Sequence, residues 1–392
     1  MDDILETLVE HWEANTPVAL ATVVSTFKSA PRVPGASLLV TPGGEVTGSV
    51  SGGCVEGAVY ELATQVLSDG TPQLVRYGFS DADAFEIGLT CGGIVDIFVQ
   101  RIDRDTAPWV GELAAAVRDG REVAVATVIE HPVSGTLARA VLLGGDDAAT
   151  LGHLGDERLD RVVLDDARGV LRTGRSGTLS YGTDIRRQGE GIRVFVWSFA
   201  PPPRLIVFGA IDFAAALAEV GSFLGYRVTV CDARPIFATN ARFPKADEVV
   251  VEWPHRYLRR EAEEHRVDAR TAICVLTHDA KFDVPVLEVA LRLPSVGYVG
   301  AMGSRTTHAD RLSRLVEVGI SNDLLDQLHS PIGLDIGANT PHETALSIAA
   351  EILATRSRAT GMPLRTLGGP IHGRTALLAG TAHAEQRESP RV

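Results

Sequence analysis

A repeat in the first half of the chain limits the folds that this half can adopt. Residues 18–24 (VALATVV) recur as residues 123–129 (VAVATVI), 105 positions later. Residues 77–78 (YG) recur as residues 181–182, 104 positions later, as one deletion in the second copy would produce. The alternative is coincidence, because strands rich in valine and alanine resemble one another. We expect a true repeat, in which two similar α/β halves pack together.

Only the first copy carries a glycine–cysteine loop. The repeat aligns residues 51–54 (SGGC) with residues 155–158 (GDER). Glycine has no Cβ, so backbone N–H groups there can come close to a bound group. We expect a helix to begin just after Cys54, where unpaired N–H groups and the helix dipole favour an anion beside a thiolate. The candidate site residues in this loop are Ser51, Gly52, Gly53, Cys54 and Glu56.

Each of these residues also has a purely structural interpretation. Cys54 could be a small buried hydrophobic residue, as most cysteines outside disulfides are. Glu56, in the first helical turn, either complements the dipole or acts as a base. A second thiol, Cys91, lies in residues 88–93 (GLTCGG). Its glycines either form a second glycine-rich binding loop or only make the turn into a strand over residues 94–99.

The cysteine count excludes several classes of metal site. The chain has four cysteines and no C-x-x-C spacing, so a structural zinc site is not expected. Four cysteines cannot supply the eight ligands of two [2Fe–2S] clusters, so the chain is not by itself an iron–sulfur flavoenzyme. Two structural disulfides would need an oxidising compartment, which nothing else in the sequence suggests. We therefore expect reduced thiols.

Length and charge narrow the class of protein further. At 392 residues the chain is too long for one ordinary core, so two domains are expected. A formal charge of −13 disfavours nucleic acids and anionic membranes as partners. The sequence has no apolar run long enough for a transmembrane helix, and it begins with acidic residues rather than a signal peptide. These features predict a cytoplasmic protein.

Three consecutive prolines, residues 201–203, divide the chain. Prolines continue neither a helix nor a central strand, and they favour an extended spacer. After them, short apolar strands alternate with amphipathic helices, which predicts a doubly wound, Rossmann-like parallel sheet. The expected organisation is an N-terminal α/β domain with an internal repeat over residues 1–200, a Rossmann-like domain over 201–358, and a flexible tail over 359–392.

The first turn of the Rossmann-like half departs from a dinucleotide fingerprint. A glycine is needed at its second position so that the backbone can approach a pyrophosphate, and Ile211 stands there after Gly209. Asp212 follows, either as a helix cap or as a charge that repels phosphate. Asp232 lies where a ribose-binding acid would fall, or only caps a turn. NAD(P) binding is therefore doubtful, although Gly209 and Asp232 stay candidate cofactor-binding residues.

Other candidates follow strands of the same predicted sheet. Ligands of open α/β sheets gather at the carboxyl ends of the strands. A polar loop follows the strand of residues 272–276, small residues follow the strand of 295–299, and a glycine-rich loop covers residues 331–337. Polar loops that only start the next helix have the same composition. The candidate cofactor-binding residues in these loops are Thr277, His278, Asp279, Gly300, Ser304, Arg305 and Asp335.

Taken together, several motifs resemble those of the XdhC/CoxI family. They are residues 51–56 (SGGCVE), 89–93 (LTCGG), 298–304 (YVGAMGS) and 331–337 (PIGLDIG). The resemblance extends to about residue 357 and adds Thr90 to the candidate cofactor-binding residues. The family commonly has Gly-Ala-Gly-His at the Rossmann turn, where this chain has residues 209–212 (GAID). This departure puts the role of that turn in doubt.

The resemblance implies an accessory protein of molybdenum hydroxylases such as xanthine dehydrogenase. It implies that the chain binds molybdenum cofactor, protects it during sulfuration by a cysteine desulfurase and delivers it to the hydroxylase apoenzyme. It also implies a homodimer, and a Cys54 thiolate is a suitable soft ligand for molybdenum. Two alternatives are a nicotinamide-dependent oxidoreductase, suggested by the Rossmann-like half, and a scaffold that recruits the hydroxylase through its surface.

Overall fold

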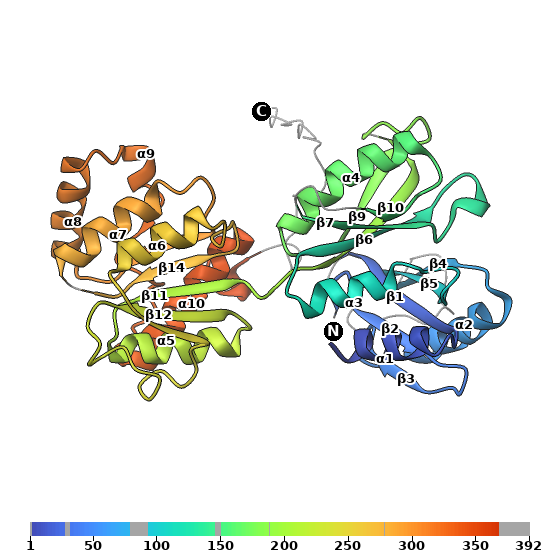
Figure 1. Cartoon of the computed structure of the whole chain (residues 1–392), viewed down its shortest axis with the longest axis horizontal. Coiled ribbons are helices and arrows are strands. Elements are labelled where there is room, and N and C mark those ends of the chain that lie inside the picture. Colours follow the sequence, from blue (N-terminus) through green and yellow to red (C-terminus); the bar gives the residue numbers. More distant parts are fainter. Residues whose placement is uncertain are drawn as a thin grey trace, which may run out of the picture. The chain divides into compact units, whose positions relative to one another are not determined.

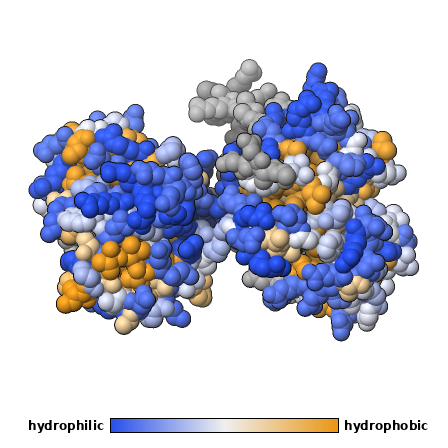
Figure 2. All heavy atoms as spheres, viewed as in Figure 1, coloured by the Kyte–Doolittle hydropathy of each residue, from blue (hydrophilic) through white to orange (hydrophobic). Residues whose placement is uncertain are grey.

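The computed structural model describes residues 2–27, 32–78, 93–145, 150–187, 189–277 and 279–367. These residues form two compact units, of which the first ends at Pro201 and the second spans Pro202–Leu367 (Figure 1). Within the described ranges, every helix is too short or too polar to cross a membrane. Most of the visible surface of both units is hydrophilic, with smaller hydrophobic groups between (Figure 2). The predicted mixed α/β class is confirmed.

Unit 1 contains two antiparallel sheets of the same topology, which confirms the predicted repeat. The first sheet has the order β3-β2-β1-β5-β4 and the second has the order β8-β7-β6-β10-β9. The elements of the first copy are α1 (Asp2–Glu13), β1 (Val18–Phe27), β2 (Ser37–Val40), β3 (Val46–Gly48), α2 (Glu56–Asp69), β4 (Gln73–Gly78) and β5 (Ile94–Ile102). Those of the second are α3 (Val110–Arg118), β6 (Val123–Glu130), η1 (Ser134–Thr136), β7 (Ala140–Gly144), β8 (Leu151–Gly152), α4 (Glu157–Arg172), β9 (Gly177–Gly182) and β10 (Gly191–Phe199).

Each sheet of unit 1 is covered on both faces. One hydrophobic cluster joins the two sheets with α1 and α3, and includes Leu20, Phe98, Val125 and Trp197. A second cluster packs α2 on the other face of the first sheet, and a third packs α4 on the second sheet. Burial on both faces explains why β1 reads as a continuous apolar run rather than an alternating one.

Two glycines hold equivalent positions in the copies. Gly48 and Gly152 both have positive φ values, +89° and +98°. A Cβ on either would come within 2.3 Å of a carbonyl oxygen of the neighbouring strand. From Gly48 to Glu56, the start of α2, seven residues intervene, whereas four separate Gly152 from Glu157, the start of α4. The alignment expected from sequence is nevertheless confirmed, because buried residues of the two helices, such as Val59 and Val163, keep the 104-residue offset. The second copy has the same number of residues here, and its helix begins three residues earlier.

Unit 2 is built on a six-stranded parallel sheet with the order β13-β12-β11-β14-β15-β16. This is the Rossmann order 3-2-1-4-5-6, so the predicted doubly wound sheet is confirmed. Its elements are β11 (Arg204–Phe208), α5 (Asp212–Phe223), β12 (Arg227–Asp232), β13 (Glu248–Val251), α6 (Pro254–Glu263), β14 (Ala272–Val275), α7 (Ala280–Leu291), β15 (Tyr298–Ala301), α8 (Arg305–Glu317), α9 (Asn322–Leu325), β16 (Leu328–His329), α10 (Pro341–Ser357) and η2 (Leu364–Thr366).

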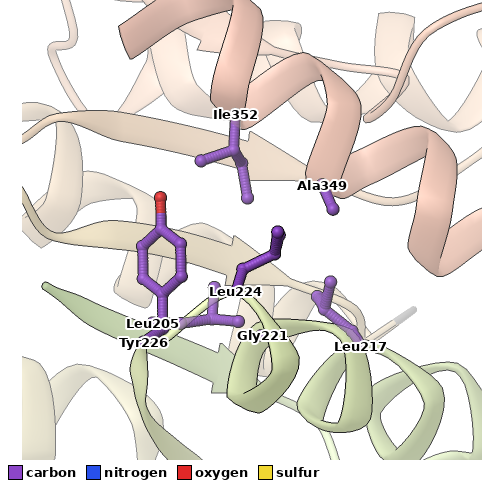
Figure 3. Close-up of a pocket in the computed structure, with 7 residues that line it drawn as sticks. All are labelled: Leu205, Leu217, Gly221, Leu224, Tyr226, Ala349 and Ile352. Carbon is purple, nitrogen blue, oxygen red and sulfur yellow. The ribbon is translucent and has the colours of Figure 1, made fainter. Parts of the chain in front are cut away.

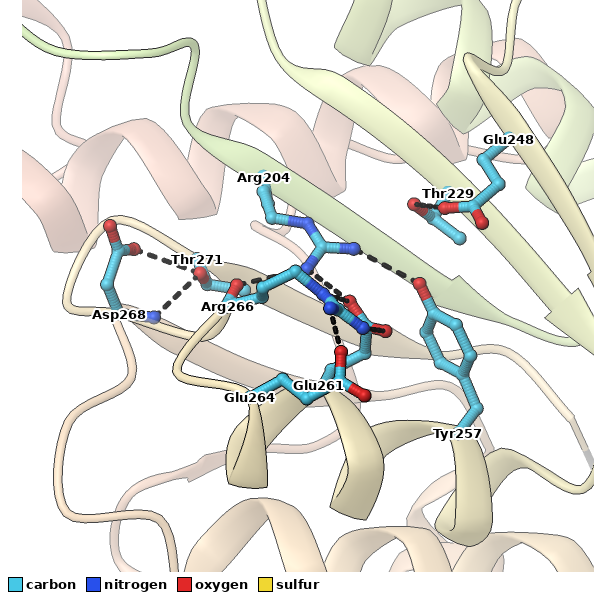
Figure 4. A network of polar contacts seen from close by, with 9 residues as sticks. All are labelled: Arg204, Thr229, Glu248, Tyr257, Glu261, Glu264, Arg266, Asp268 and Thr271. Carbon is cyan, nitrogen blue, oxygen red and sulfur yellow. Dashed lines mark hydrogen bonds and ion pairs between the residues drawn. The ribbon is translucent and has the colours of Figure 1, made fainter. Parts of the chain in front are cut away.

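Helices cover both faces of this sheet. One cluster packs α5 and α10 on one face, and another packs α6, α7 and α8 on the other. Near the start of β11, Arg204 donates to Glu261 at 2.7 Å and to the Tyr257 hydroxyl at 3.1 Å (Figure 4). Burial alone would raise the pKa of Glu261, but hydrogen bonds from Arg266 and Arg204 outweigh it and lower that pKa to about 2. This buried network fixes α6 against the sheet.

Candidate functional site

One carboxylate closes the loop between β3 and α2. Both oxygens of Glu56 turn back onto the backbone that precedes it. Oε1 accepts the N–H groups of Ser51 and Gly52, both at 2.9 Å. Oε2 accepts the N–H groups of Gly53 at 2.8 Å and Val55 at 3.2 Å. The side chain therefore occupies the position that the sequence led us to expect for an external anion.

Two serine hydroxyls complete this closure. Ser49 donates to Glu56 Oε1 at 2.7 Å and accepts the N–H of Gly52 at 3.0 Å. Ser51 donates to Glu56 Oε2 and accepts the N–H groups of Cys54 and Val55, both at 3.0 Å. The expectation that these N–H groups lie open to an anion is thus wrong, because the chain satisfies them itself. Ser49 was missed as part of this loop because it precedes the glycine motif.

The environment of Glu56 makes it a poor general base. Burial would raise its pKa, but hydrogen bonds from the hydroxyls of Ser51 and Ser49 and from backbone N–H groups outweigh burial and lower the pKa to about 2. A carboxylate with such a pKa accepts a proton only weakly at neutral pH. Of the two interpretations of Glu56 given above, this favours the structural one.

The two glycines that precede Cys54 face open space. Gly52 and Gly53 have φ values of +81° and +119°, which side chains rarely tolerate. Nothing lies within 4 Å of where their Cβ atoms would be, so the glycines serve the backbone conformation and leave the space above them open. Cys54 is half-buried and packs against the hydrophobic cluster beneath α2.

β3 leads into this loop in the direction of the strand ends at which residues 79–92 join the first sheet. Those ends are Phe27 of β1 and Gly78 of β4, which both pair with Ile94. Gly48, from which the loop departs, pairs with Leu38, which in turn pairs with Ala21, six positions before Phe27. Thr90 and Cys91 themselves lie outside the described residues. The candidate site is therefore described around Cys54.

A buried carboxylate near the end of β1 joins the two copies. Asp96 of β5 is 2% exposed. It accepts Arg76 Nε at 2.6 Å and, from the second copy, Arg193 Nη2 at 3.1 Å. Arg193 also donates to the Ser25 hydroxyl at 3.0 Å. This network joins the two sheets of unit 1 near the ends of β1 and β4, and no local sequence pattern predicts it.

In unit 2, the predicted ribose-binding acid is already engaged. Asp232 accepts the N–H of Ala210 at 2.7 Å and the Nε and Nη2 of Arg234 at 2.9 and 2.7 Å. Gly209 has a φ of +112°, and a Cβ there would come within 2.8 Å of Thr277. These contacts explain both residues structurally. They also leave Asp232 poorly available to a ribose hydroxyl.

Thr277 belongs to a buried network at the carboxyl ends of β14 and β15. It donates to Asp283, which accepts Arg311 Nη2 at 3.0 Å. Arg311 also donates to the carbonyl of Met302 at 2.7 Å. Asp279 instead lies exposed, where it caps α7 and pairs with Lys281, whose hydrogen bond lowers the pKa of Asp279. Sequence reasoning missed Asp283 as Thr277's partner, and it missed Arg311.

The remaining predicted residues of unit 2 are not brought together around one space. Gly300 is buried in β15, where a Cβ would come within 2.6 Å of Ile332, so packing requires a glycine there and its role in cofactor binding stays a prediction. Ser304 caps α8 by accepting the N–H of Thr307 at 3.1 Å. Arg305 and Asp335 are exposed at the surface, and His278 lies outside the described residues.

The other thiols of the described chain are inert. Cys231 and Cys274 are buried, and burial raises the pKa of both. Within the described ranges, no three His, Cys, Asp or Glu side chains gather as a metal site. A cavity of about 10 Å³ between β11, α5 and α10 is lined almost wholly by carbon (Figure 3). It is too small and too apolar for a polar ligand.

Two family models match the chain. One, described as the XdhC and CoxI family, matches residues 11–78 and 116–182. The other, described as the XdhC Rossmann domain, matches residues 205–352. The first match includes the whole loop from Ser49 to Glu56 and stops where β4 ends.

Relatives and a solved structure match over almost the full length. A Bacillus subtilis (strain 168) protein, named as a probable subunit of xanthine dehydrogenase, is 29% identical over 357 residues, 91% of this chain and 97% of that protein. An Escherichia coli (strain K12) protein named "Molybdenum cofactor insertion chaperone PaoD" is 27% identical over 353 residues, 90% of this chain and 88% of that protein. A crystal structure of a Bacillus halodurans protein named xanthine dehydrogenase has a TM-score of 0.64 and 25% identity, covering 92% of this chain and 97% of its own.

Proposed function

Because this chain belongs to the XdhC and CoxI family, we propose that it binds the molybdenum cofactor and inserts it into a molybdenum hydroxylase. The family match and the name of the E. coli relative support the cofactor as cargo. The name of the B. subtilis relative supports a hydroxylase of the xanthine dehydrogenase type as recipient. The proposal extends to protection of the bound cofactor while a cysteine desulfurase sulfurates it, and to a cytoplasmic homodimer.

The single observation that carries the proposal is the Cys54 loop. A sulfur donor suits a soft metal such as the molybdenum of the cofactor. Cys54 is the one described cysteine that is not fully buried, and its loop leaves open space above Gly52 and Gly53. We assign Cys54 to the molybdenum side of the cargo.

Glu56 has a positioning role in this proposal. Its carboxylate holds the N–H groups of Ser51, Gly52, Gly53 and Val55, so the loop stays in one conformation before cargo arrives. A preorganised loop lowers the entropic cost of binding. The phosphate of the cofactor is therefore bound elsewhere than at these N–H groups.

The nicotinamide alternative gains no support from unit 2. Asp232 is engaged by Arg234 and Ala210, and Ile211 stands where a pyrophosphate needs glycine. Asp212 adds an exposed negative charge beside that position. Titration with NAD and NADP tests this directly, and micromolar binding would revive an oxidoreductase.

Purification from cells that make the cofactor tests the proposed function. The chain should carry molybdenum and pterin, and Cys54→Ser should lower both by about tenfold or more, as loss of a ligand shell does. Cys231→Ser is the matched control, because Cys231 is a buried thiol of unit 2. The proposal fails if cofactor-replete cells yield a chain without molybdenum or pterin. It also fails if Cys54→Ser loads and activates the hydroxylase as the native chain does.

A further inference from the structure

Unit 2 contains a hollow that the proposed function does not use. It measures about 230 Å³ and lies beyond the carboxyl ends of β11 and β12. This volume suits a small ligand better than a drug-sized one, and ligands of doubly wound sheets bind at this end of the strands. Its lining combines two arginines, one aromatic ring, one carboxylate and two aliphatic residues. The lining residues are Ala210, Ile211, Asp212, Arg234, Phe237 and Arg242.

The two arginines are held in place at this hollow. The guanidinium carbons of Arg234 and Arg242 lie 4.7 and 5.7 Å from the centre of the Phe237 ring. Arg234 is also fixed by the buried Asp232, at 2.7 Å. Arg242 donates to the carbonyl of Ala210 at 3.2 Å. Two long side chains that are usually mobile are thus preorganised.

Both arginines keep donors for a ligand. Asp232 takes the Nε and Nη2 of Arg234, and Nη1 has no partner among the residues that the structure describes. Arg242 uses Nη1 and Nη2, and its Nε has no partner within the same ranges. A guanidinium carries five N–H donors, so each of the two can still bind an oxyanion.

We propose that this hollow binds the phosphate of a ring-containing phosphate monoester, clamped between Arg234 and Arg242. A phosphate monoester carries nearly two negative charges at neutral pH, which two guanidinium groups match better than one. Phe237 and Ile211 add apolar surface for the attached ring. A pyrophosphate fits less well, because Asp212, which is 84% exposed, stands at the start of α5. The same chemistry is offered by a nucleoside monophosphate and by the phosphate end of the molybdenum cofactor.

Calorimetric titration of the full chain, free of cofactor, with adenosine 5′-monophosphate, adenosine and inorganic phosphate tests the site. The monophosphate should bind and adenosine should not. Arg242→Gln should weaken binding by about tenfold or more, because it removes a charge-assisted hydrogen bond. Asp212→Asn should strengthen binding by about threefold, because it removes a negative charge that pairs with Arg242 at 3.1 Å and competes with the phosphate for that guanidinium. Arg242→Gln and Asp212→Asn should therefore change the affinity in opposite directions, which a general loss of structure would not do.

Arg314→Gln is the matched control, because Arg314 is an exposed arginine of the same unit that pairs with Asp310 at 2.9 Å. It should leave binding unchanged. The proposal is overturned if neither adenosine 5′-monophosphate nor inorganic phosphate binds at a concentration of about 1 mM, which would detect even weak binding. It is equally overturned if Arg242→Gln binds as the native chain does.

Repeating the titration on cofactor-loaded chain distinguishes the two sources. If the site holds the phosphate of the cofactor, loading should lower the affinity for adenosine 5′-monophosphate by about tenfold or more. If it holds a nucleotide, the affinity should be the same with and without cofactor. The cofactor arm alone depends on the proposed function. A chain that binds no cofactor would refute that function while the titration of the cofactor-free chain still tests the hollow.

Discussion

The two copies of unit 1 share a scaffold and differ at one loop. Strand order, the covering helix and the glycines Gly48 and Gly152 are the same in both. Between that glycine and the following helix, the first copy has three more residues than the second, because α4 begins three residues earlier than α2. The number of residues is the same in both copies, since the buried Val59 and Val163 keep the 104-residue offset. The residues that are helical in the second copy and form a loop in the first include Cys54.

The two copies also differ in how the first turn of their covering helix is capped. In the second copy, Asp156 caps α4 by accepting the N–H groups of Arg158 and Leu159 at 2.8 and 3.0 Å. In the first copy, Val55 has no capping side chain, and Glu56 reaches back over the longer loop. One copy thus ends its loop with a short local cap, while the other maintains an exposed, fixed loop with a thiol. This contrast indicates that duplication supplied the scaffold, and that the first copy replaces the first helical turn of the second by the loop that carries the site.

Exchanging the loop should have the largest effect. Replacing residues 51–56 (SGGCVE) by residues 155–160 (GDERLD) gives the first copy the capped helix start of the second at unchanged length. We expect unit 1 to fold and activation of the hydroxylase to fall by about a hundredfold, since the metal-side contacts are lost. Activation assays and thermal melting check this. Full activation by the exchanged chain would show that the loop is not the site.

Glu56→Gln should cost stability, while Glu157→Gln, at the first position of α4 in the second copy, should not. Glu56 accepts several hydrogen bonds as a charged group, so we expect a loss of about 2–3 kcal/mol in the free energy of unfolding. For Glu157, which has no side-chain hydrogen bond within the described chain, the change should stay below about 0.5 kcal/mol. Urea unfolding at neutral pH measures both. Equal losses would mean that the two loops are closed alike.

The Glu56 effect should also depend on pH. The pKa of Glu56 is lowered from 4.5 to about 2 in the folded chain. Its contribution to stability is therefore complete above pH 4.5 and is lost as pH falls toward 2. The difference between the native chain and Glu56→Gln should shrink over that interval. A constant difference would contradict the assignment.

Removing the cap of the second copy should have a smaller effect. Asp156→Ala leaves two N–H groups of α4 without an acceptor, which costs about 1 kcal/mol. Cofactor content should be unchanged, because the second copy carries no thiol. Denaturant unfolding and molybdenum analysis of the same sample check both parts. A loss of cofactor in this variant would assign function to the second copy.

Removing the hydroxyl groups of Tyr181 and Tyr77, which are equivalent in the two copies, should give the smallest difference in stability. Tyr181 donates to Asp166 at 3.0 Å, whereas the hydroxyl of Tyr77, its equivalent, has no such partner in the described part of the chain. Tyr181→Phe should cost about 1 kcal/mol and Tyr77→Phe less than about 0.5 kcal/mol. Unfolding curves of the two variants give the comparison directly. A larger cost at Tyr77 would indicate a polar contact specific to the first copy.

Sequence patterns predicted most of the fold. The spacing of the apolar runs predicted the parallel sheet, and the recurrence of residues 18–24 as residues 123–129 predicted the repeat. The loop alignment also held, because the offset of 104 residues is the same at Gly48 and Gly152 before the loop and at Tyr77 and Tyr181 after it. The alignment did not predict that the second copy begins its helix three residues earlier, where Asp156 caps it.

The site was harder to predict than the fold. The Ser51–Glu56 stretch is local, so its residues were found, but the direction in which Glu56 turns depends on three-dimensional geometry. Asp96 and Arg193 are 97 positions apart, and Arg234 and Arg242 converge only through Phe237. Contacts between elements of this kind leave no periodic trace in a single sequence.

X-ray absorption at the molybdenum edge of the cofactor-loaded chain tests the central claim most directly. The claim is that Cys54, carried by the loop that precedes α2 in the first copy, contributes sulfur to the metal. The native chain should show one more sulfur neighbour at molybdenum than loaded Cys54→Ser, and Cys231→Ser should match the native chain. Identical spectra for the native chain and Cys54→Ser would contradict the claim.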